Sequence, residues 1–274
     1  MGWRSWNCFA QHNDDASMRA MFDALVDRSR SAAGANDDEG NGAGAGVSLL
    51  ELGYRSVGMD DGFQRCNCST PQGPFPHSVT NVSCSVNDCR NGLCTWHNQT
   101  DGGRVMIDTL RFPDLKGLVA RGHALGLEVG FYLNTCICME KTRRGEPYPY
   151  FAQDVAFLRE MDFDAVKIDQ CGSAMNMSLW AALINATGRP MLLENCHNSP
   201  SWWSPGASAA TVCDSNMWRS GGDIAPGFAD VLSKAHATIR DNNVSAANPW
   251  GARPLSRPGC WAYVRRFRYA LHSS

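Results

Sequence analysis

Short apolar strands that end in charged side chains recur along this chain, and they limit its fold more than any other feature. Ala165–Ile168 leads into Asp169, and residues 54–59 lead into Asp60 and Asp61. Charged groups at the carboxyl ends of strands are typical of (β/α)8 enzymes, which carry their chemistry there. No Gly-x-Gly-x-x-Gly turn follows any strand, which argues against a dinucleotide-binding sheet. We therefore predict an α/β fold, a (β/α)8 TIM barrel.

Hydrophobic periodicity places the individual elements. Apolar residues at helical spacing predict helices, and short apolar runs predict the strands between them. Strand, helix and strand follow one another at distances that suit parallel βαβ units. Helices are predicted over residues 15–26 (with Asp15 as N-cap), 49–52, 112–126 and 153–161, and strands over residues 1–9, 54–59, 127–132, 165–168, 190–194 and 216–219.

The length of 274 residues suits one barrel of ordinary size. We predict a single catalytic domain over residues 1–274, interrupted by two insertions. Residues 29–47 are rich in Ser, Ala, Gly, Asn and Asp, and such a low-complexity stretch buries too little apolar surface to order itself. Residues 63–104 form a long Cys-rich loop.

Cysteine usage indicates an oxidising compartment. The chain has 12 cysteines, and Asn-x-Ser/Thr sequons occur at Asn67, Asn81, Asn98, Asn176, Asn185 and Asn243. Both features favour a secreted or lysosomal/vacuolar protein. Met1–Trp6 has neither the basic nor the apolar region of a signal peptide, so we expect either an incomplete start or an intracellular protein. The loop 63–104 lacks the Cys-x2-Cys spacing of a zinc site, so we predict disulfides within it and leave their pairing open.

Charge and hydropathy narrow the range of partners. A net charge of −2 without a long basic run argues against nucleic acid. No apolar segment has the length of a membrane span. Asp60-Asp61-Gly62 offers too few regularly spaced oxygen ligands for a calcium loop. We predict no metal and no cofactor, and we leave the oligomeric state open.

Asp169 is the first candidate for a catalytic group because it ends a buried strand. The alternative is that Asp169 caps the next helix or pairs with Lys167. Asp60 and Asp61 are adjacent, so they point to opposite sides of their strand. One of them is expected at the barrel mouth and the other in the loop, unless the pair is ordinary turn chemistry.

Five stretches of the chain together resemble glycoside hydrolase family 27, the α-galactosidase family of clan D. They occur in the family's order and spacing and extend over nearly the whole chain outside the two insertions. The five stretches are Met1–Asn7, residues 52–61 (Leu-Gly-Tyr through Asp-Asp), Gly126–Tyr132, Val166–Cys171 and Trp218–Ile224.

This resemblance implies a retaining mechanism, in which Asp169 is the nucleophile and Asp223 the general acid/base. Such a mechanism needs two carboxyl groups about 5 to 5.5 Å apart. For the remaining residues it implies that Asp60 and Asp61 bind the 4- and 6-hydroxyls of galactose, that Lys167 binds the sugar beside the nucleophile, that Arg219 lies near the 2-hydroxyl, that Trp6 and Tyr132 line the pocket, and that disulfides join Cys136 with Cys171 and Cys196 with Cys213.

Two departures from the family pattern affect the expected substrate and fold. Where the family has Cys-Glu-Trp after the fifth strand, this chain has residues 194–198, so either Glu194 or His197 takes the place that selects the sugar. A second family segment begins at 258–263 and then breaks into 264–268. We therefore predict a barrel that is incomplete at its C-terminal end, without the last strand and the C-terminal β-sandwich. Such a barrel exposes a parallel edge, so we expect poor stability and an activity that is weak or absent.

The predicted function is hydrolysis of terminal α-D-galactosyl residues, with an α-galactoside carbohydrate as the partner. A β-L-arabinopyranosidase is the nearest alternative, because that sugar is galactose without its hydroxymethyl group. An inactive carbohydrate-binding fragment is the alternative from another class. A Cys-rich structural protein fits the ordered motifs least well.

Overall fold

The computed structural model contains one parallel sheet of seven strands whose spatial order equals their order in the chain. It describes residues 2–29, 46–68, 94–98, 100–134, 138, 148–169, 176–196, 213–219, 223, 227–242, 256 and 258–263. The strands are β1 (Gly2–Arg4), β2 (Ser56–Gly58), β7 (Glu128–Leu133), β8 (Ala165–Asp169), β9 (Leu192–Cys196), β10 (Met217–Arg219) and β11 (Trp261–Tyr263). Neighbouring strands are all parallel. This arrangement is that of part of a (β/α)8 barrel.

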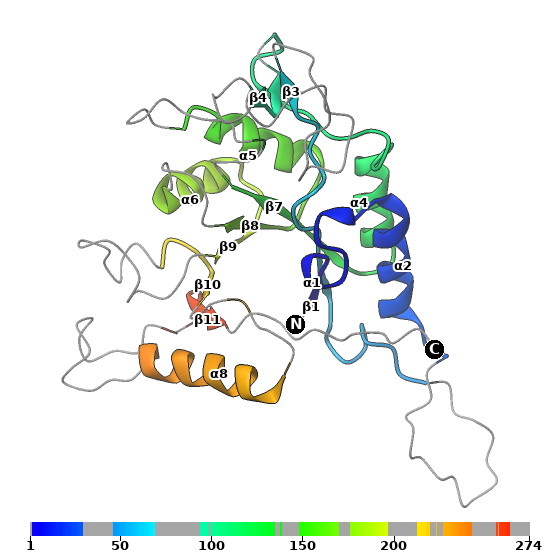
Figure 1. Ribbon diagram of the computed structural model, residues 1–274, viewed down its shortest axis with the longest axis vertical. Helices are drawn as coiled ribbons and strands as arrows, with labels where there is room; N and C mark the ends of the chain where they lie inside the picture. Colours follow the sequence, from blue (N-terminus) through cyan, green and yellow to red (C-terminus); the bar gives the residue numbers. More distant parts are fainter. Residues whose placement is uncertain are drawn as a thin grey trace, which may run out of the picture.

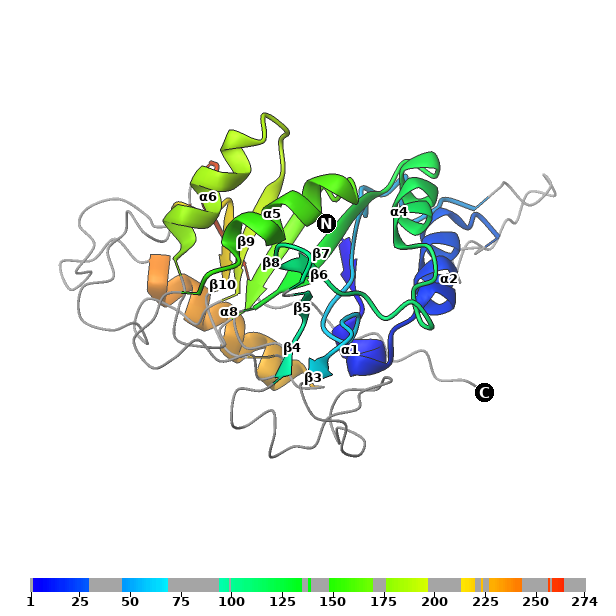
Figure 2. The same ribbon diagram turned by 90° about the horizontal axis from the view of Figure 1, so that it is seen from above.

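Helices cover the outer face of the curled sheet (Figures 1 and 2). Two short helical elements follow β1, and short strands lie in the connection between β2 and β7. The helices are α1 (Trp6–Phe9), the 3-10 helix η1 (Ala10–His12), α2 (Asp15–Val26), α4 (Leu115–Ala124), α5 (Phe151–Glu160), α6 (Met177–Ala186) and α8 (Phe228–Asn242). Two antiparallel pairs join β3 (Asn67–Cys68) with β4 (Cys94–Thr95), and β5 (His97–Asn98) with β6 (Arg104–Val105).

Helix α2 has the bounds that its periodicity predicts, but its cap differs from the prediction. The carboxylate of Asp14 accepts a hydrogen bond from Ser17 N, and the Ser17 hydroxyl contacts Asp14 N in return. Asp14 is therefore the N-cap, and the prediction of Asp15 was wrong. Asp15 lies in the first turn, where it pairs with Arg19 one turn further on.

The core lies between the helices and the sheet. Phe131 on β7 packs against Phe157 on α5, with ring centroids 5.4 Å apart, and against Phe163, at 4.6 Å. A Cβ added at Gly122 would lie 2.4 Å from Val129 Cγ2, so this glycine permits α4 to approach β7 closely. Close packing of this kind fixes the strand positions from which the site residues project.

Two predicted elements are wrong, and several elements were not predicted. The predicted strand over residues 1–9 ends at Arg4, because Ser5 N bonds to Gly58 O and the chain then turns into α1. The predicted helix at 49–52 is a turn, closed by a bond from Gly53 N to Leu50 O. Helices α6 and α8, the barrel strand β11 and the short strands β3 to β6 were not predicted. The other predicted elements are present with bounds shifted by a few residues.

The disulfides differ from those expected. Cys66 bonds to Cys138, which lies outside the loop 63–104, so a pairing of this cysteine within the loop was wrong. The predicted pair Cys196–Cys213 is also wrong: Cys213 bonds to Cys260, with the two Cα atoms 5.1 Å apart, and Cys196 is a buried free thiol. The reason is that Cys196 faces the barrel interior, whereas Cys213 and Cys260 lie just before the adjacent strands β10 and β11.

Other expectations fall on residues outside the described ranges. These are the pair Cys136–Cys171, the side chain of His197 and most of the two insertions. Among the described residues, no helix combines the length and apolar character needed to cross a membrane.

Candidate active site

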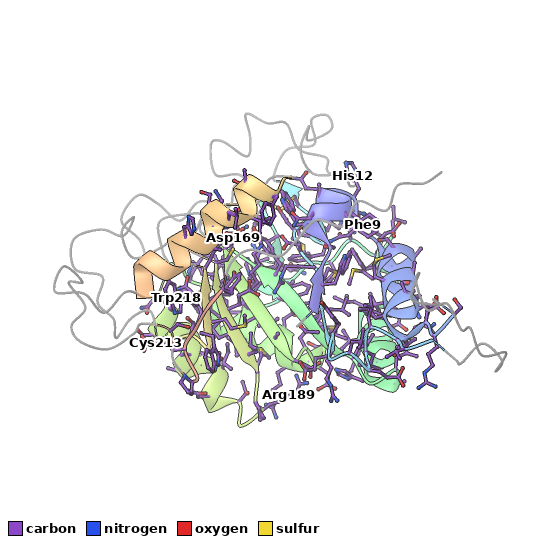
Figure 3. The ribbon with its side chains drawn as sticks, turned by 90° about the horizontal axis from the view of Figure 1, so that it is seen from below. Phe9, His12, Asp169, Arg189, Cys213 and Trp218 are labelled. Atoms are coloured by element: carbon purple, nitrogen blue, oxygen red, sulfur yellow. A yellow bond between two sulfur atoms is a disulfide. The ribbon has the colours of Figure 1, made fainter. Side chains whose placement is uncertain are left out.

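The carboxyl ends of the strands gather the predicted site residues at one end of the sheet. Figure 3 shows Asp169 toward the same end as Phe9 and His12, whereas Arg189, which precedes β9, lies at the opposite end. Parallel strands bring their carboxyl ends to one edge, so residues far apart in sequence meet there.

Two buried polar side chains hold the turn after β2. The Ser5 hydroxyl accepts a hydrogen bond from Asp60 N at 2.9 Å. Asn13 Nδ2 donates to the carbonyl oxygens of Asp60, at 3.1 Å, and Asp61, at 3.3 Å. Ser5 and Asn13 are both fully buried. These bonds fix the backbone from which the two adjacent carboxylates project, and the sequence patterns assigned a role to neither residue.

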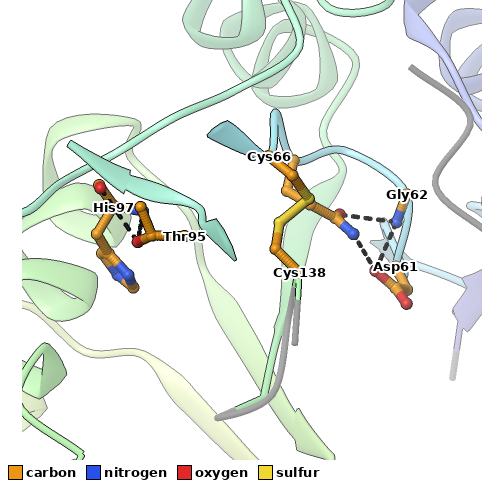
Figure 4. Close-up of a disulfide and its surroundings, with 7 residues drawn as sticks. Asp61, Gly62, Cys66, Thr95, His97 and Cys138 are labelled. Carbon is orange, nitrogen blue, oxygen red and sulfur yellow. Dashed lines mark hydrogen bonds between the residues drawn. A yellow bond between two sulfur atoms is a disulfide. The ribbon is translucent and has the colours of Figure 1, made fainter. Parts of the chain in front are cut away.

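Asp60 and Asp61 have different surroundings, as their opposite directions predict. Asp60 is buried and faces the interior. Asp61 Oδ1 accepts hydrogen bonds from Gly62 N at 2.8 Å and Gln64 Nε2 at 3.0 Å, next to the Cys66–Cys138 disulfide (Figure 4). Burial raises the pKa of Asp61, and these two hydrogen bonds oppose the effect only in part.

Lys167 joins the end of β2 to the end of β8. Its ammonium donates to Asp60 Oδ2 at 2.9 Å and lies 3.7 Å from Asp169 Oδ2. The side chains of Lys167 and Asp60 are 1% and 2% exposed, whereas that of Asp169 is 24% exposed. Burial lowers the pKa of Lys167, but the charges of Asp60 and Asp169 outweigh it and the net pKa is raised. The lysine is therefore a permanent cation between two carboxylates.

Asp169 is oriented by a second donor. The Tyr132 hydroxyl donates to Asp169 Oδ2 at 3.1 Å, and Asn134 Nδ2 donates to that hydroxyl at 2.9 Å. Lys167 Nζ lies 4.7 Å from the centroid of the Tyr132 ring. Burial and the charge of Asp169 raise the pKa of Tyr132 well above its usual value, which keeps its proton in place. An ionised carboxylate held in this way is suited to nucleophilic attack.

Arg219 and Asp223 form the other half of the predicted site. Arg219 ends β10, and its Nη1 donates to Asp223 Oδ1 at 2.8 Å. The arginine side chain is 8% exposed and the aspartate side chain 63% exposed. Asp223 thus has one anchored oxygen and access to solvent. Trp6, the remaining predicted residue, is half-buried in α1 directly after Ser5.

Glu194 takes part in a network that the sequence did not indicate. Its carboxylate forms an ion pair with Arg4 on β1 and accepts a hydrogen bond from the Tyr263 hydroxyl on β11. Glu194 is buried, in register with Lys167 on the neighbouring strand. Inward-facing Arg and Glu residues within short apolar strands are the signal that could have revealed this network.

The thiol of Cys196 lies within the same charged interior. Cys196 is in register with Asp169, and burial raises the pKa of its thiol to about 12. A neutral thiol of this kind is a poor nucleophile. Within the described ranges, no three His, Cys, Asp or Glu side chains lie close enough to hold a metal ion.

No protein-family model matches the chain, but it is similar to curated glycosidases. It is 28% identical over 239 residues to α-galactosidase A of Cellvibrio japonicus, and this alignment covers 82% of this chain and 44% of that protein. It is 28% identical over 193 residues to human α-N-acetylgalactosaminidase, covering 65% and 42% of the two chains. The chain therefore spans less than half the length of these relatives.

Solved glycosidases share its fold. An α-galactosidase from Saccharomyces cerevisiae, solved with raffinose, gives a TM-score of 0.54 at 18% identity over 83% of this chain and 40% of the other. A family 27 β-L-arabinopyranosidase from Geobacillus stearothermophilus, solved with arabinose, gives 0.57 at 15% identity over 96% and 60%. These likenesses and the seven parallel strands agree on part of a (β/α)8 barrel.

Proposed function

We propose that this chain is the catalytic barrel of a retaining exo-glycosidase that releases terminal α-D-galactosyl residues. The observation that carries the proposal is the position of Lys167, whose ammonium lies 2.9 Å from Asp60 and 3.7 Å from Asp169. This lysine links Asp60, a carboxylate suited to binding sugar hydroxyls, to Asp169, a carboxylate suited to attacking the anomeric carbon. The similarity to curated α-galactosidases supports the choice of substrate.

Each carboxylate has a role that fits its surroundings. Asp169, next to Lys167 and Tyr132, attacks the anomeric carbon while Asp223 transfers a proton to the departing oxygen. Asp223 then removes a proton from the water that releases the sugar from Asp169, so the product keeps its anomeric configuration. Arg219, which holds one oxygen of Asp223, orients the other oxygen toward the leaving group.

The sugar contacts follow the predicted roles. Asp60 and Asp61 accept hydrogen bonds from the 4- and 6-hydroxyls, since ionised carboxylates make stronger hydrogen bonds than neutral acceptors do. Lys167 and Arg219 donate to the sugar from β8 and β10. Tyr132 and Trp6 present aromatic surface to its apolar face.

Hydrolysis of 4-nitrophenyl α-D-galactoside by the purified chain and by Asp169→Asn tests this function. Activity that disappears in Asp169→Asn, with a product of retained configuration by NMR, supports it. Glu160→Gln is a matched control, because this carboxylate is exposed and pairs with Arg104 far from the strand ends. Equal activity in the wild-type chain and Asp169→Asn would contradict the assignment of the nucleophile.

A β-L-arabinopyranosidase is the second candidate, favoured by the likeness to the Geobacillus enzyme. The same assay with 4-nitrophenyl β-L-arabinopyranoside separates the two activities, because only the galactoside has a 6-hydroxyl for Asp60 or Asp61. An inactive carbohydrate-binding fragment predicts galactose binding that Asp169→Asn leaves unchanged and no turnover of either substrate.

The proposed compartment is secreted or lysosomal/vacuolar. The disulfides Cys66–Cys138 and Cys213–Cys260 support it, because disulfides persist in oxidising compartments. Mass spectrometry of the native protein under non-reducing conditions tests this, and free thiols at all four positions would count against it.

A further inference from the structure

Arg4 crosses the barrel interior from the first strand to the fifth. Its register partner on β2 is Gly58, and a Cβ added there would lie 2.8 Å from Arg4 Nη1 and 2.9 Å from its Cζ. The guanidinium therefore occupies the space that a side chain at Gly58 would fill. Nη1 then reaches Phe131 O on β7 at 3.4 Å, and Nη2 reaches Glu194 on β9.

Glu194 uses both of its carboxylate oxygens in this network. Oε2 pairs with Arg4, and Oε1 accepts the hydrogen bond from Tyr263. The side chains of Arg4 and Glu194 are 14% and 8% exposed, so solvent screens their interaction little. The network joins β1, β9 and β11, which include both edge strands of the sheet.

Arg4 also faces the same side of the sheet as the proposed sugar-binding carboxylate, because its guanidinium lies over Gly58 and Asp60 follows Gly58 by two positions in the chain. Burial lowers the pKa of Arg4, but the charges of Glu194 and Asp60 outweigh this effect, so the net pKa is raised. Asp60 therefore shares the barrel interior with two cations, the largely buried Arg4 and the fully buried Lys167. Its hydrogen bond goes to Lys167, at 2.9 Å, while Arg4 is engaged by Glu194.

We propose that Glu194 is a positioning residue for sugar binding. From β9 it binds the guanidinium of Arg4, so that Lys167 alone pairs with the Asp60 carboxylate. This inference rests on the proposed function, in which Asp60 and Lys167 contact the sugar. Without the charge of Glu194, Arg4 would be a largely buried cation that has lost its ion-pair partner and that faces the same interior as the Asp60 carboxylate. A buried charge without a partner is costly, so Arg4 would turn to Asp60 and compete with Lys167.

Glu194→Gln is the direct test, because the amide keeps the size and an acceptor for Tyr263 but removes the charge. The expected crystal structure has Arg4 bonded to Asp60 and the Lys167 Nζ–Asp60 Oδ2 contact broken. The expected kinetics are a KM raised about tenfold with kcat changed less than about threefold, as when ground-state and transition-state binding are lost together. A kcat loss at unchanged KM would overturn the proposal.

A second variant separates positioning from general damage. Arg4→Met with Glu194→Met removes the competing cation together with its partner, and such apolar replacement of a buried ion pair is often tolerated. We expect this double variant to regain the Lys167–Asp60 contact and a KM near that of the wild type. Asp154→Asn is the matched control, because this buried carboxylate bonds to His97 and Tyr148, neither of which belongs to the proposed site, and its KM should not change.

The structural readout keeps the inference separate from the proposed function. If the wild-type chain hydrolyses neither substrate and binds no galactose, the proposed function fails, but the position of Asp60 in Glu194→Gln still decides the role of Glu194. An unchanged Lys167–Asp60 contact in Glu194→Gln would overturn the inference whatever the activity. A double variant as impaired as Glu194→Gln would do the same.

Discussion

Lys167 and Asp60 form an ion pair that is almost completely withdrawn from solvent, with Nζ 2.9 Å from Oδ2. The two residues are 107 positions apart in sequence and belong to β8 and to the turn after β2. Since the same ammonium lies 3.7 Å from Asp169, this pair links the proposed sugar-binding carboxylate to the proposed nucleophile.

Removing the cation of this pair should destabilise the fold. Lys167→Met leaves Asp60 buried without its ammonium partner, and breaking a buried pair in this way costs about 3–5 kcal/mol. Arg104→Met is the control, because its pair with Glu160 is exposed and is expected to contribute less than about 1 kcal/mol. Urea unfolding at neutral pH measures both, and equal losses would contradict the strength assigned to the buried pair.

The role of Asp223 predicts a dependence on the leaving group. Asp223→Ala removes the proton donor, and general acid catalysis contributes about 10²- to 10⁴-fold. A 4-nitrophenolate leaves readily without a proton, whereas the alkoxide of a sugar hydroxyl does not. The first, glycosyl-transfer step should therefore slow far more for a galactosyl disaccharide than for the nitrophenyl galactoside. Pre-steady-state rates for both substrates check this, and equal slowing would assign the proton transfer to another group.

As the pH is lowered, sugar affinity should be lost at a higher pH than the pH at which an ordinary aspartate becomes protonated. Burial raises the pKa of Asp61, and the nearby charge of Asp60 adds to that effect. Asp61 binds hydroxyls as an acceptor in its ionised form, so affinity is complete above its native pKa and is lost as the pH falls through it. Galactose titration calorimetry over a pH series should show this loss above the pH at which an ordinary aspartate titrates, and Asp61→Asn should remove that component.

Gln64 offers a matched change beside the same carboxylate. Its Nε2 donates to Asp61 Oδ1, a hydrogen bond that lowers the pKa of Asp61. Gln64→Met removes that donor and should move the loss of affinity to higher pH. A shift to lower pH, or none, would show that Asp61 does not govern the binding.

The disulfide at the sheet edge should contribute more to the free energy of unfolding than an exposed free cysteine does. Cys213 and Cys260 precede β10 and β11 and enclose a separation of 47 residues. Replacing both with Ser should cost about 2–4 kcal/mol of stability. Cys8→Ser is the control, because that free cysteine is exposed and should change stability by less than about 0.5 kcal/mol. Thermal unfolding of the two variants compares them, and equal melting temperatures would argue against the bond.

Local patterns predicted most of the barrel's elements. Helix α2 follows its apolar spacing, and the strand ending at Asp169 follows its apolar run, because periodicity records which face of an element is buried. The turn at residues 49–53 was misread because three leucines there imitate a helical stripe. Helix α8 was missed. Phe228, the first residue of this helix, is 76% exposed, so the apolar residues of the first turn do not follow the buried face of the helix.

The sequence by itself determined the alternation of strands and helices, the charged residues at strand ends and the resemblance that assigned roles to Asp169 and Asp223. Only the tertiary structure decided partners: Lys167 with Asp60, Glu194 with Arg4 and Tyr263, and Cys213 with Cys260. The physical reason is that hydrophobic periodicity reports the burial of each element one at a time. Which buried charges and thiols meet depends on the register and curl of seven strands together, and no single segment contains that information.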